Sequence, residues 1–165
     1  CQSSADCGGT RACVAPFGNP PTCFNTCNDD SECAGGGSRC VAGNEVSGFG
    51  VSVCSHDCDP STSVGCDAGQ GCDIYATDAT MTTLYTDCRP AGALQLGATC
   101  DPTMPASCAA STYCASGTTS TDQSFQSCLK WCDLSLFNCP PGYSCLRNEP
   151  PAIVGPREYG LCLPQ

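Results

Sequence analysis

The sequence predicts a small disulfide-rich fold, in which five tandem four-cysteine β-hairpin modules stack as an elongated rod with little regular secondary structure. Twenty of the 165 residues are cysteine. Leu, Ile, Val and Phe together contribute only 23 residues, which is too few for an ordinary hydrophobic core. The entropy lost on folding therefore has to be offset mainly by covalent cross-links. The third observation is that the cysteine spacing repeats five times.

Each repeat contains four cysteines, and five repeats use all of them. The first gap is five to seven residues long and the second is five or six, whereas the third varies from nine to sixteen. The segment between the third and fourth cysteines is therefore a loop of adjustable length. Unit by unit, the cysteines are Cys1, Cys7, Cys13, Cys23; Cys27, Cys33, Cys40, Cys54; Cys58, Cys66, Cys72, Cys88; Cys100, Cys108, Cys114, Cys128; and Cys132, Cys139, Cys145, Cys162.

The units occupy residues 1–26, 27–57, 58–88, 100–131 and 132–165, and residues 89–99 form a linker that contains Gly, Pro and Ala. Three-residue links join the other units, so we expect consecutive units to stack end to end, each touching only its neighbours. The linker is interpreted as dividing units one to three from units four and five.

Turn residues define the compact half of each unit. In four units Asn or Asp directly follows the first cysteine, where a short polar side chain can close an Asx-turn: Asn28, Asp59, Asp101 and Asp133. The gap between the second and third cysteines usually contains glycine, as a tight turn requires. The variable half predicts a β-hairpin, because its arms are rich in β-branched and aromatic residues and its tip is polar, as between Cys72 and Cys88.

One segment departs from this pattern. Phe125, Leu129, Cys132 and Leu136 follow one another at spacings of four, three and four residues. This periodicity predicts a short helix across the boundary of units four and five.

Four cysteines allow three connectivities in each unit. Pairing neighbours would leave two independent loops with almost nothing to bury, so we favour an interlocked pattern of first to third and second to fourth. We expect Cys1 to be bridged rather than lipid-modified, because its spacing to Cys7 matches that of unit two.

The motifs C-P-P-G-Y-S-C at 139–145 and C-D-A-G-Q-G-C at 66–72 resemble the first four cysteines of EGF-like modules. The acid ahead of the second cysteine and the glycines after it, as in residues 1–13, are similar to the Dickkopf N-terminal cysteine-rich region. Strings of small acidic units low in lysine are also similar to secreted and surface proteins of myxobacteria. The chain lacks the fifth and sixth EGF cysteines and the adjacent Cys–Cys of Dickkopf, so neither family's signalling role is carried over. The resemblance implies an extracellular module that binds or spaces.

Charge and cysteine spacing exclude several classes of function. The formal net charge is −10, and the six basic residues are dispersed, which argues against nucleic-acid and anionic-membrane partners. No apolar run is long enough to insert into a membrane. The chain contains no C-x-x-C pair, the spacing on which zinc and iron–sulfur sites rely. We therefore expect structural disulfides and no cofactor. Disulfides at this density place the protein in an oxidising compartment, extracellular or at the cell surface.

Side chains for catalysis or metal binding are scarce. His56 is the only histidine, and its sequence neighbour Asp57 is poorly placed for a triad, so we expect no enzyme. Bound Ca²⁺ is a weak possibility, because acidic residues gather around unit three, although no EF-hand run is present. The calcium candidates are Asp57, Asp59, Asp67, Asp73 and Asp78.

Large apolar residues concentrate in one short stretch of units four and five. Trp131 is its centre, with Phe125, Leu129 and Phe137 as further partner-binding candidates. Aromatic residues of this kind anchor protein interfaces, but they can equally fill the joint between two units. Either interpretation makes this stretch the strongest interaction signal.

Together these features predict an extracellular structural spacer or an adhesive or appendage component that works through a protein partner or self-assembly. The alternative is a ligand-binding ectodomain, with or without bound calcium, whose hairpin tips carry specificity. A protease inhibitor with Arg157 or Lys130 as the bait residue is a third possibility.

Overall fold

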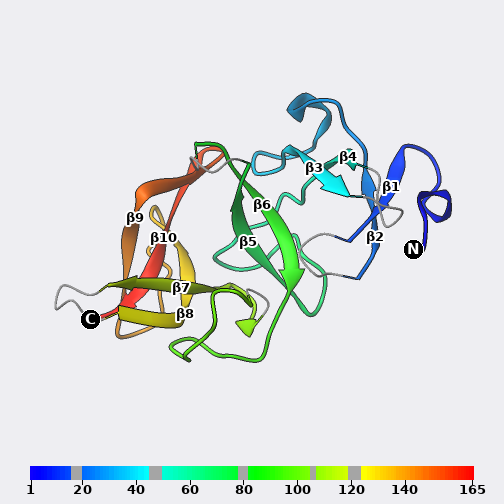
Figure 1. Ribbon diagram of the computed structural model, residues 1–165. Coiled ribbons are helices and arrows are strands. Elements are labelled where there is room, and N and C mark those ends of the chain that lie inside the picture. Colours follow the sequence, from blue (N-terminus) through cyan, green and yellow to red (C-terminus); the bar gives the residue numbers. More distant parts are fainter. Residues whose placement is uncertain (16–19, 45–49, 78–81, 105–106, 119–123) are drawn as a thin grey trace.

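A computed structural model describes residues 1–15, 20–44, 50–77, 82–104, 107–118 and 124–165. Within these ranges the regular elements are ten strands and two three-residue 3-10 helices, which confirms a small disulfide-rich β fold with almost no helix. Figure 1 shows the β5–β6 hairpin between β1–β4 on one side and β7–β10 on the other. In chain order the elements are η1 (Ser4–Asp6), β1 (Arg11–Val14), β2 (Thr22–Asn25), η3 (Asp30–Glu32), β3 (Cys40–Asn44), β4 (Gly50–Cys54), β5 (Gln70–Ala76), β6 (Leu84–Pro90), β7 (Thr112–Thr118), β8 (Ser124–Asp133), β9 (Tyr143–Val154) and β10 (Arg157–Pro164).

In every unit the third and fourth cysteines lie opposite each other at the base of an antiparallel hairpin. The first cysteine is bonded to the third and the second to the fourth, with Cα–Cα distances of 5.4–5.9 Å, so the interlocked pattern is confirmed. The two bridges fasten the compact half of each unit to the hairpin. The pairs are Cys1–Cys13, Cys7–Cys23, Cys27–Cys40, Cys33–Cys54, Cys58–Cys72, Cys66–Cys88, Cys100–Cys114, Cys108–Cys128, Cys132–Cys145 and Cys139–Cys162.

Carboxylates close the turns of the compact halves. In units three, four and five the aspartate after the first cysteine accepts a hydrogen bond from the backbone N–H two residues on, as an Asx-turn requires. In units one and two the acid before the second cysteine does equivalent work, because Asp6 accepts from the N–H of Gln2 and Glu32 from that of Asn28. These side chains replace the backbone ladder that the compact half lacks.

Three of the four links between units end in backbone pairing. In these three units the residue before the first cysteine pairs with the residue before the fourth, as an isolated bridge in units two and four and within strand β8 in unit five. The nitrogen of the first cysteine then donates to the carbonyl two residues before the fourth in units one, two and four. A link that belongs to a hydrogen-bonded ladder cannot swivel. The paired residues are Thr26 with Val53, Thr99 with Ser127, and Trp131 with Leu161.

The helix predicted around Phe125–Leu136 is wrong, because most of this segment is strand β8. Cys128 and Cys132 both lie on this strand but belong to different units: Cys128 is the fourth cysteine of unit four, and Cys132 is the first of unit five. The strand pairs with β7 in its first part and with β10 in its last, so units four and five share a four-stranded sheet in the order β7-β8-β10-β9. Pairing on both edges overrides the helical spacing of the apolar residues.

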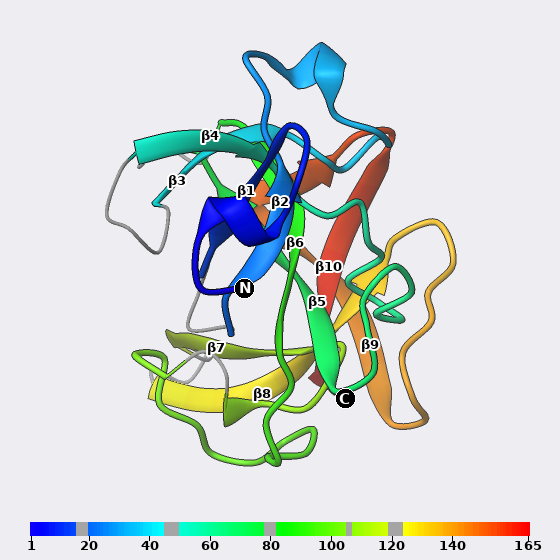
Figure 2. The same ribbon diagram turned by 90° about the vertical axis from the view of Figure 1, so that its right-hand side faces the viewer.

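The expectation that each unit touches only its neighbours is also wrong. Unit five contacts unit three, where Arg157 Nη1 lies 3.1 Å from Asp59 Oδ2. It also contacts unit two, because the backbones of Gly155 and Gly36 approach closely. Figure 2 shows the β9–β10 hairpin beside β5 and β6, and strands β6 and β9 are in contact. The units therefore fold back on one another around unit three.

The linker 89–99 binds both of its flanking units. The N–H of Ala91 donates to the carbonyl of Gly69 in unit three, and that of Gly92 donates to Cys108 in unit four. Leu94 makes a parallel bridge with Cys108. The segment joins units three and four rather than dividing them.

Among the described residues the buried apolar side chains other than cysteine form two small clusters rather than one core, and disulfide cysteines form two more. One of the apolar clusters lies between units one and two, and the other lies where units three, four and five meet. The first contains Ala12, Val14, Phe24 and Val53, and the second contains Leu84, Trp131, Ala152, Val154 and Tyr159.

Gly155→Ala should lower the free energy of unfolding by about 2–3 kcal/mol, because the new Cβ would strain the backbone and also clash with unit two. Gly155 has φ +56°, and a Cβ there would lie 2.6 Å from the carbonyl oxygen of Gly36. Gly9→Ala is the matched control, because Gly9 has φ +60° but nothing within 4 Å of its Cβ position. Guanidinium unfolding with the bridges intact measures both, and equal losses would contradict a tight contact between units two and five.

Candidate functional site

A buried ion pair holds units three and four together. Arg89 Nε donates to Asp73 Oδ2 at 3.0 Å, and both side chains are almost completely buried. Trp131 Nε1 donates to the other oxygen of Asp73 at 2.8 Å. The guanidinium of Arg89 also donates to the carbonyls of Cys108 and Thr112 in unit four. One carboxylate and one guanidinium thus connect units three and four through the start of the linker.

Burial and neighbouring groups have opposite effects on the pKa of Asp73. Burial raises the pKa of its carboxyl group, while Arg89 beside it and the Trp131 N–H act in the opposite direction. Removing either charge would leave the other buried without a partner, which is strongly unfavourable.

A groove of about 340 Å³ lies beside this ion pair, with walls from units three, four and five. Its aromatic lining is Tyr75, Tyr113 and Trp131, and the rings of Tyr113 and Trp131 lie 5.5 Å apart. Because the walls come from three stapled units, the groove is preformed. The residues at its polar and proline-rich rim are Ser116, Asn148, Glu149, Pro150 and Pro151.

The tyrosines of unit three remain protonated. Tyr75 and Tyr85 stack with ring centroids 5.7 Å apart. Burial raises the pKa of Tyr75 strongly and that of Tyr85 to about 12. Both phenols are therefore neutral at physiological pH.

The sequence-predicted interaction residues divide between core and surface. Trp131 and Leu129 are buried, with 6% and 3% of their surface exposed, so the structure favours the joint interpretation for both. Trp131 nonetheless lines the groove. Phe125 is half-buried and lines a different, hydroxyl-rich depression, and Phe137 is 68% exposed. The four candidates do not form one patch.

The calcium candidates do not form one cluster, although Asp57 and Asp59 line the same cavity. The Asp57 carboxylate accepts from the N–H of Gly37, Asp59 binds Ser61 and Arg157, and Asp73 is neutralised by Arg89. Asp67 is exposed. Asp78 lies outside the described residues.

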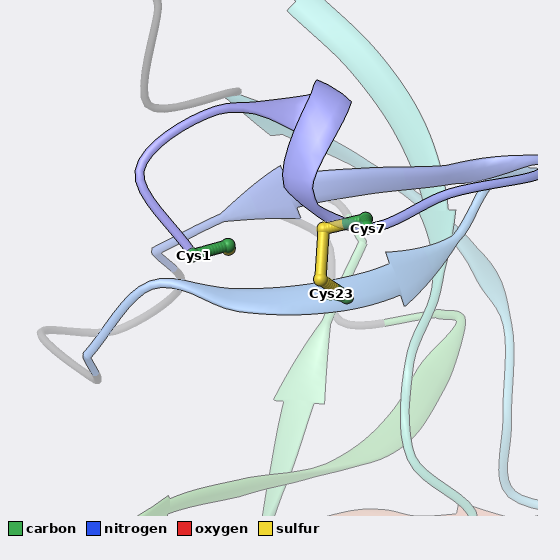
Figure 3. A group of neighbouring side chains, drawn as sticks. All are labelled: Cys1, Cys7 and Cys23. Carbon is green, nitrogen blue, oxygen red and sulfur yellow. A yellow bond between two sulfur atoms is a disulfide. The ribbon is translucent and has the colours of Figure 1, made fainter.

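Asp57 and Asp59 line one larger cavity, of about 590 Å³, between units two, three and five. In the part of the chain that the structure describes, ligand-type atoms gather in threes only at sulfurs already in disulfides. Figure 3 shows one such group, in which Cys1 lies beside the Cys7–Cys23 bridge.

The remaining candidates are occupied by structural contacts. His56 pairs with Asp87 of β6 rather than with its sequence neighbour, the Nδ1 to Oδ1 distance being 2.6 Å. Lys130 Nζ donates to the carbonyl of Asn138, and Arg157 is paired with Asp59. Lys130 lies within strand β8, and Arg157 flanks the β9–β10 turn with its guanidinium held by Asp59.

Sequence reasoning missed the Asp73–Arg89 pair, although a signal was present. Asp73 and Arg89 directly follow the third and fourth cysteines of unit three. The corresponding positions of the other units carry apolar residues, apart from Ser55 in unit two. A pair of opposite charges replacing apolar residues at two aligned positions indicates a buried ion pair.

Comparison with protein-family models, curated proteins and solved structures finds no match to this chain. Among the described residues, no helix has the length and apolar character that crossing a membrane demands. The functional argument therefore depends on the geometry of the joints and the groove.

Asp73→Asn should lower the free energy of unfolding by about 3–5 kcal/mol, because Arg89 would stay buried without a counter-charge. Glu158→Gln is the control: it removes one partner of the surface pair with Arg147 and should cost about 1 kcal/mol or less. Guanidinium unfolding followed by fluorescence of Trp131, the only tryptophan, measures both. Similar losses in the two variants would show that the buried pair has no special role.

Proposed function

We propose that this protein is a rigid structural module outside the cell, a spacer or adhesive component that acts through protein–protein contact. The observation that carries the proposal is that the residues leading into units two, four and five are held by backbone ladder pairing to the hairpin of the unit that follows. Together with ten disulfides, these ladders oppose movement of one unit against the next. Stiffness and chemical durability are what a spacer requires.

The cysteine chemistry supports the location. All twenty cysteines are paired, and disulfides at this density persist in an oxidising compartment. A net charge of −10 limits aggregation of a protein with so few apolar residues.

The groove lined by Tyr75, Tyr113 and Trp131 is the best candidate contact surface. It combines aromatic walls with a polar rim, as protein-binding sites commonly do. Its walls are held by bridges and by the Asp73–Arg89 pair, so a partner would meet little entropic cost of ordering it.

A pull-down with the immobilised chain separates the two main functions. Self-association into fibres supports the structural role, whereas capture of one defined soluble partner would favour a ligand-binding ectodomain. Small-angle scattering provides the test of rigidity: a profile that requires several arrangements of the units would contradict a spacer.

Pro151→Arg should weaken the contact about tenfold or more, because a long charged side chain would enter the groove from its rim. Leu146→Arg is the matched control, since Leu146 lies on the same strand, is 49% exposed and does not line the groove. Sedimentation velocity or surface plasmon resonance measures the change. Equal weakening in both variants, or none in either, would place the contact elsewhere.

A further inference from the structure

The joint between units two and three is built differently from the others. Units two, four and five receive the incoming strand through backbone pairing ahead of their first cysteine. In unit three the N–H of Cys58 donates instead to the side-chain oxygen of Thr86, at 3.3 Å. The N–H of Thr86 donates to the carbonyl of Gly37 in unit two. At this joint the N–H of the first cysteine is therefore bonded to a side chain, whereas in units one, two and four it is bonded to a backbone carbonyl.

His56 occupies the centre of this joint. Its Nδ1 lies 2.6 Å from Asp87 Oδ1, and the same oxygen accepts from the N–H groups of His56 and Cys88. The ring also meets Phe24 of unit one edge-on, with centroids 5.0 Å apart. One imidazole thus contacts units one and three from the link after unit two.

The charges facing His56 are both negative. Asp87 approaches from β6 with its side chain 3% exposed, and Asp67 acts from the turn ahead of β5. Phe24, from β2, is uncharged. The side chain of His56 is itself 47% exposed, so protons reach it from solvent.

We propose that this joint is a pH-responsive device, which tightens when His56 is protonated and loosens when it is neutral. Protonation leaves both partners charged and turns the hydrogen bond to the Asp87 carboxylate into an ion pair, which is stronger than the bond of a neutral imidazole. How firmly units one and two are held against the rest of the molecule then depends on pH. This inference does not depend on whether the groove binds a partner.

The direction of the effect follows from linkage. The hydrogen bond to Asp87 raises the pKa of His56 above its ordinary value of 6.5, outweighing the opposite effect of burial, and the charges of Asp87 and Asp67 add to the rise. A raised folded-state pKa means that the stabilisation is complete below pH 6.5 and is lost as pH rises through the folded pKa. The joint is therefore tight in mild acid and looser in mild alkali.

Amide hydrogen exchange tests the proposal, because equivalent joints in the same molecule serve as controls. The readouts are protection factors, corrected for intrinsic exchange, of the Cys58 and Thr86 N–H groups, with those of Cys27 and Cys100 as the backbone-paired controls. Between about pH 5.5 and about pH 8.5 we expect protection at Cys58 and Thr86 to fall about threefold relative to the controls, a modest change because His56 is half exposed.

His56→Gln should remove this pH dependence while preserving the fold, because the side chain is half exposed. Asp87→Asn should also remove it, and should lower the NMR titration midpoint of His56. The buried Asp87 variant could fail to fold, and His56→Gln alone then decides. A relative fall that persists in His56→Gln, or equal behaviour of all joints in the wild type, would overturn the proposal.

Discussion

The rest of the structure depends on one covalent constraint: the third and fourth cysteines of each unit face each other across a hairpin base and are bonded to the first and second. This clasp orders a unit that has almost no apolar interior. Because it acts only at the base, the hairpin can lengthen beyond it without disturbing the compact half. The variable third gap of the sequence is a direct result.

Backbone pairing extends this order from one unit to the next. In units two, four and five the residue before the first cysteine is paired through its backbone, so this pairing does not depend on the side chain at that position, which is Thr26, Thr99 or Trp131. The joint between units two and three is the exception, because Thr86 and Asp87 supply side-chain acceptors there. Sensitivity to sequence and to protonation is therefore concentrated in one place.

The scarce apolar residues and the buried ion pair have related roles. The Trp131 ring packs in a small apolar cluster, and its N–H donates to Asp73. One residue therefore contributes both apolar burial and a specific hydrogen bond. A buried pair contributes little net stability, but mismatched packing of units three and four would leave a charge uncompensated. We interpret Asp73 and Arg89 as residues that select one arrangement of units three and four and thereby shape two walls of the groove.

The sequence by itself determined the five units, their hairpins and the preferred disulfide pattern, because cysteine spacing and turn residues are local signals with a strict geometric meaning. It could not determine how units pack across distances in the chain. The helix expected around Leu129 became a strand because β7 and β10 pair with it, and three of the acids expected to share a cation, Asp57, Asp59 and Asp73, are held by other groups. Only the tertiary structure decided these outcomes, because ladders, ion pairs and groove walls join residues from different units, and no spacing rule relates them.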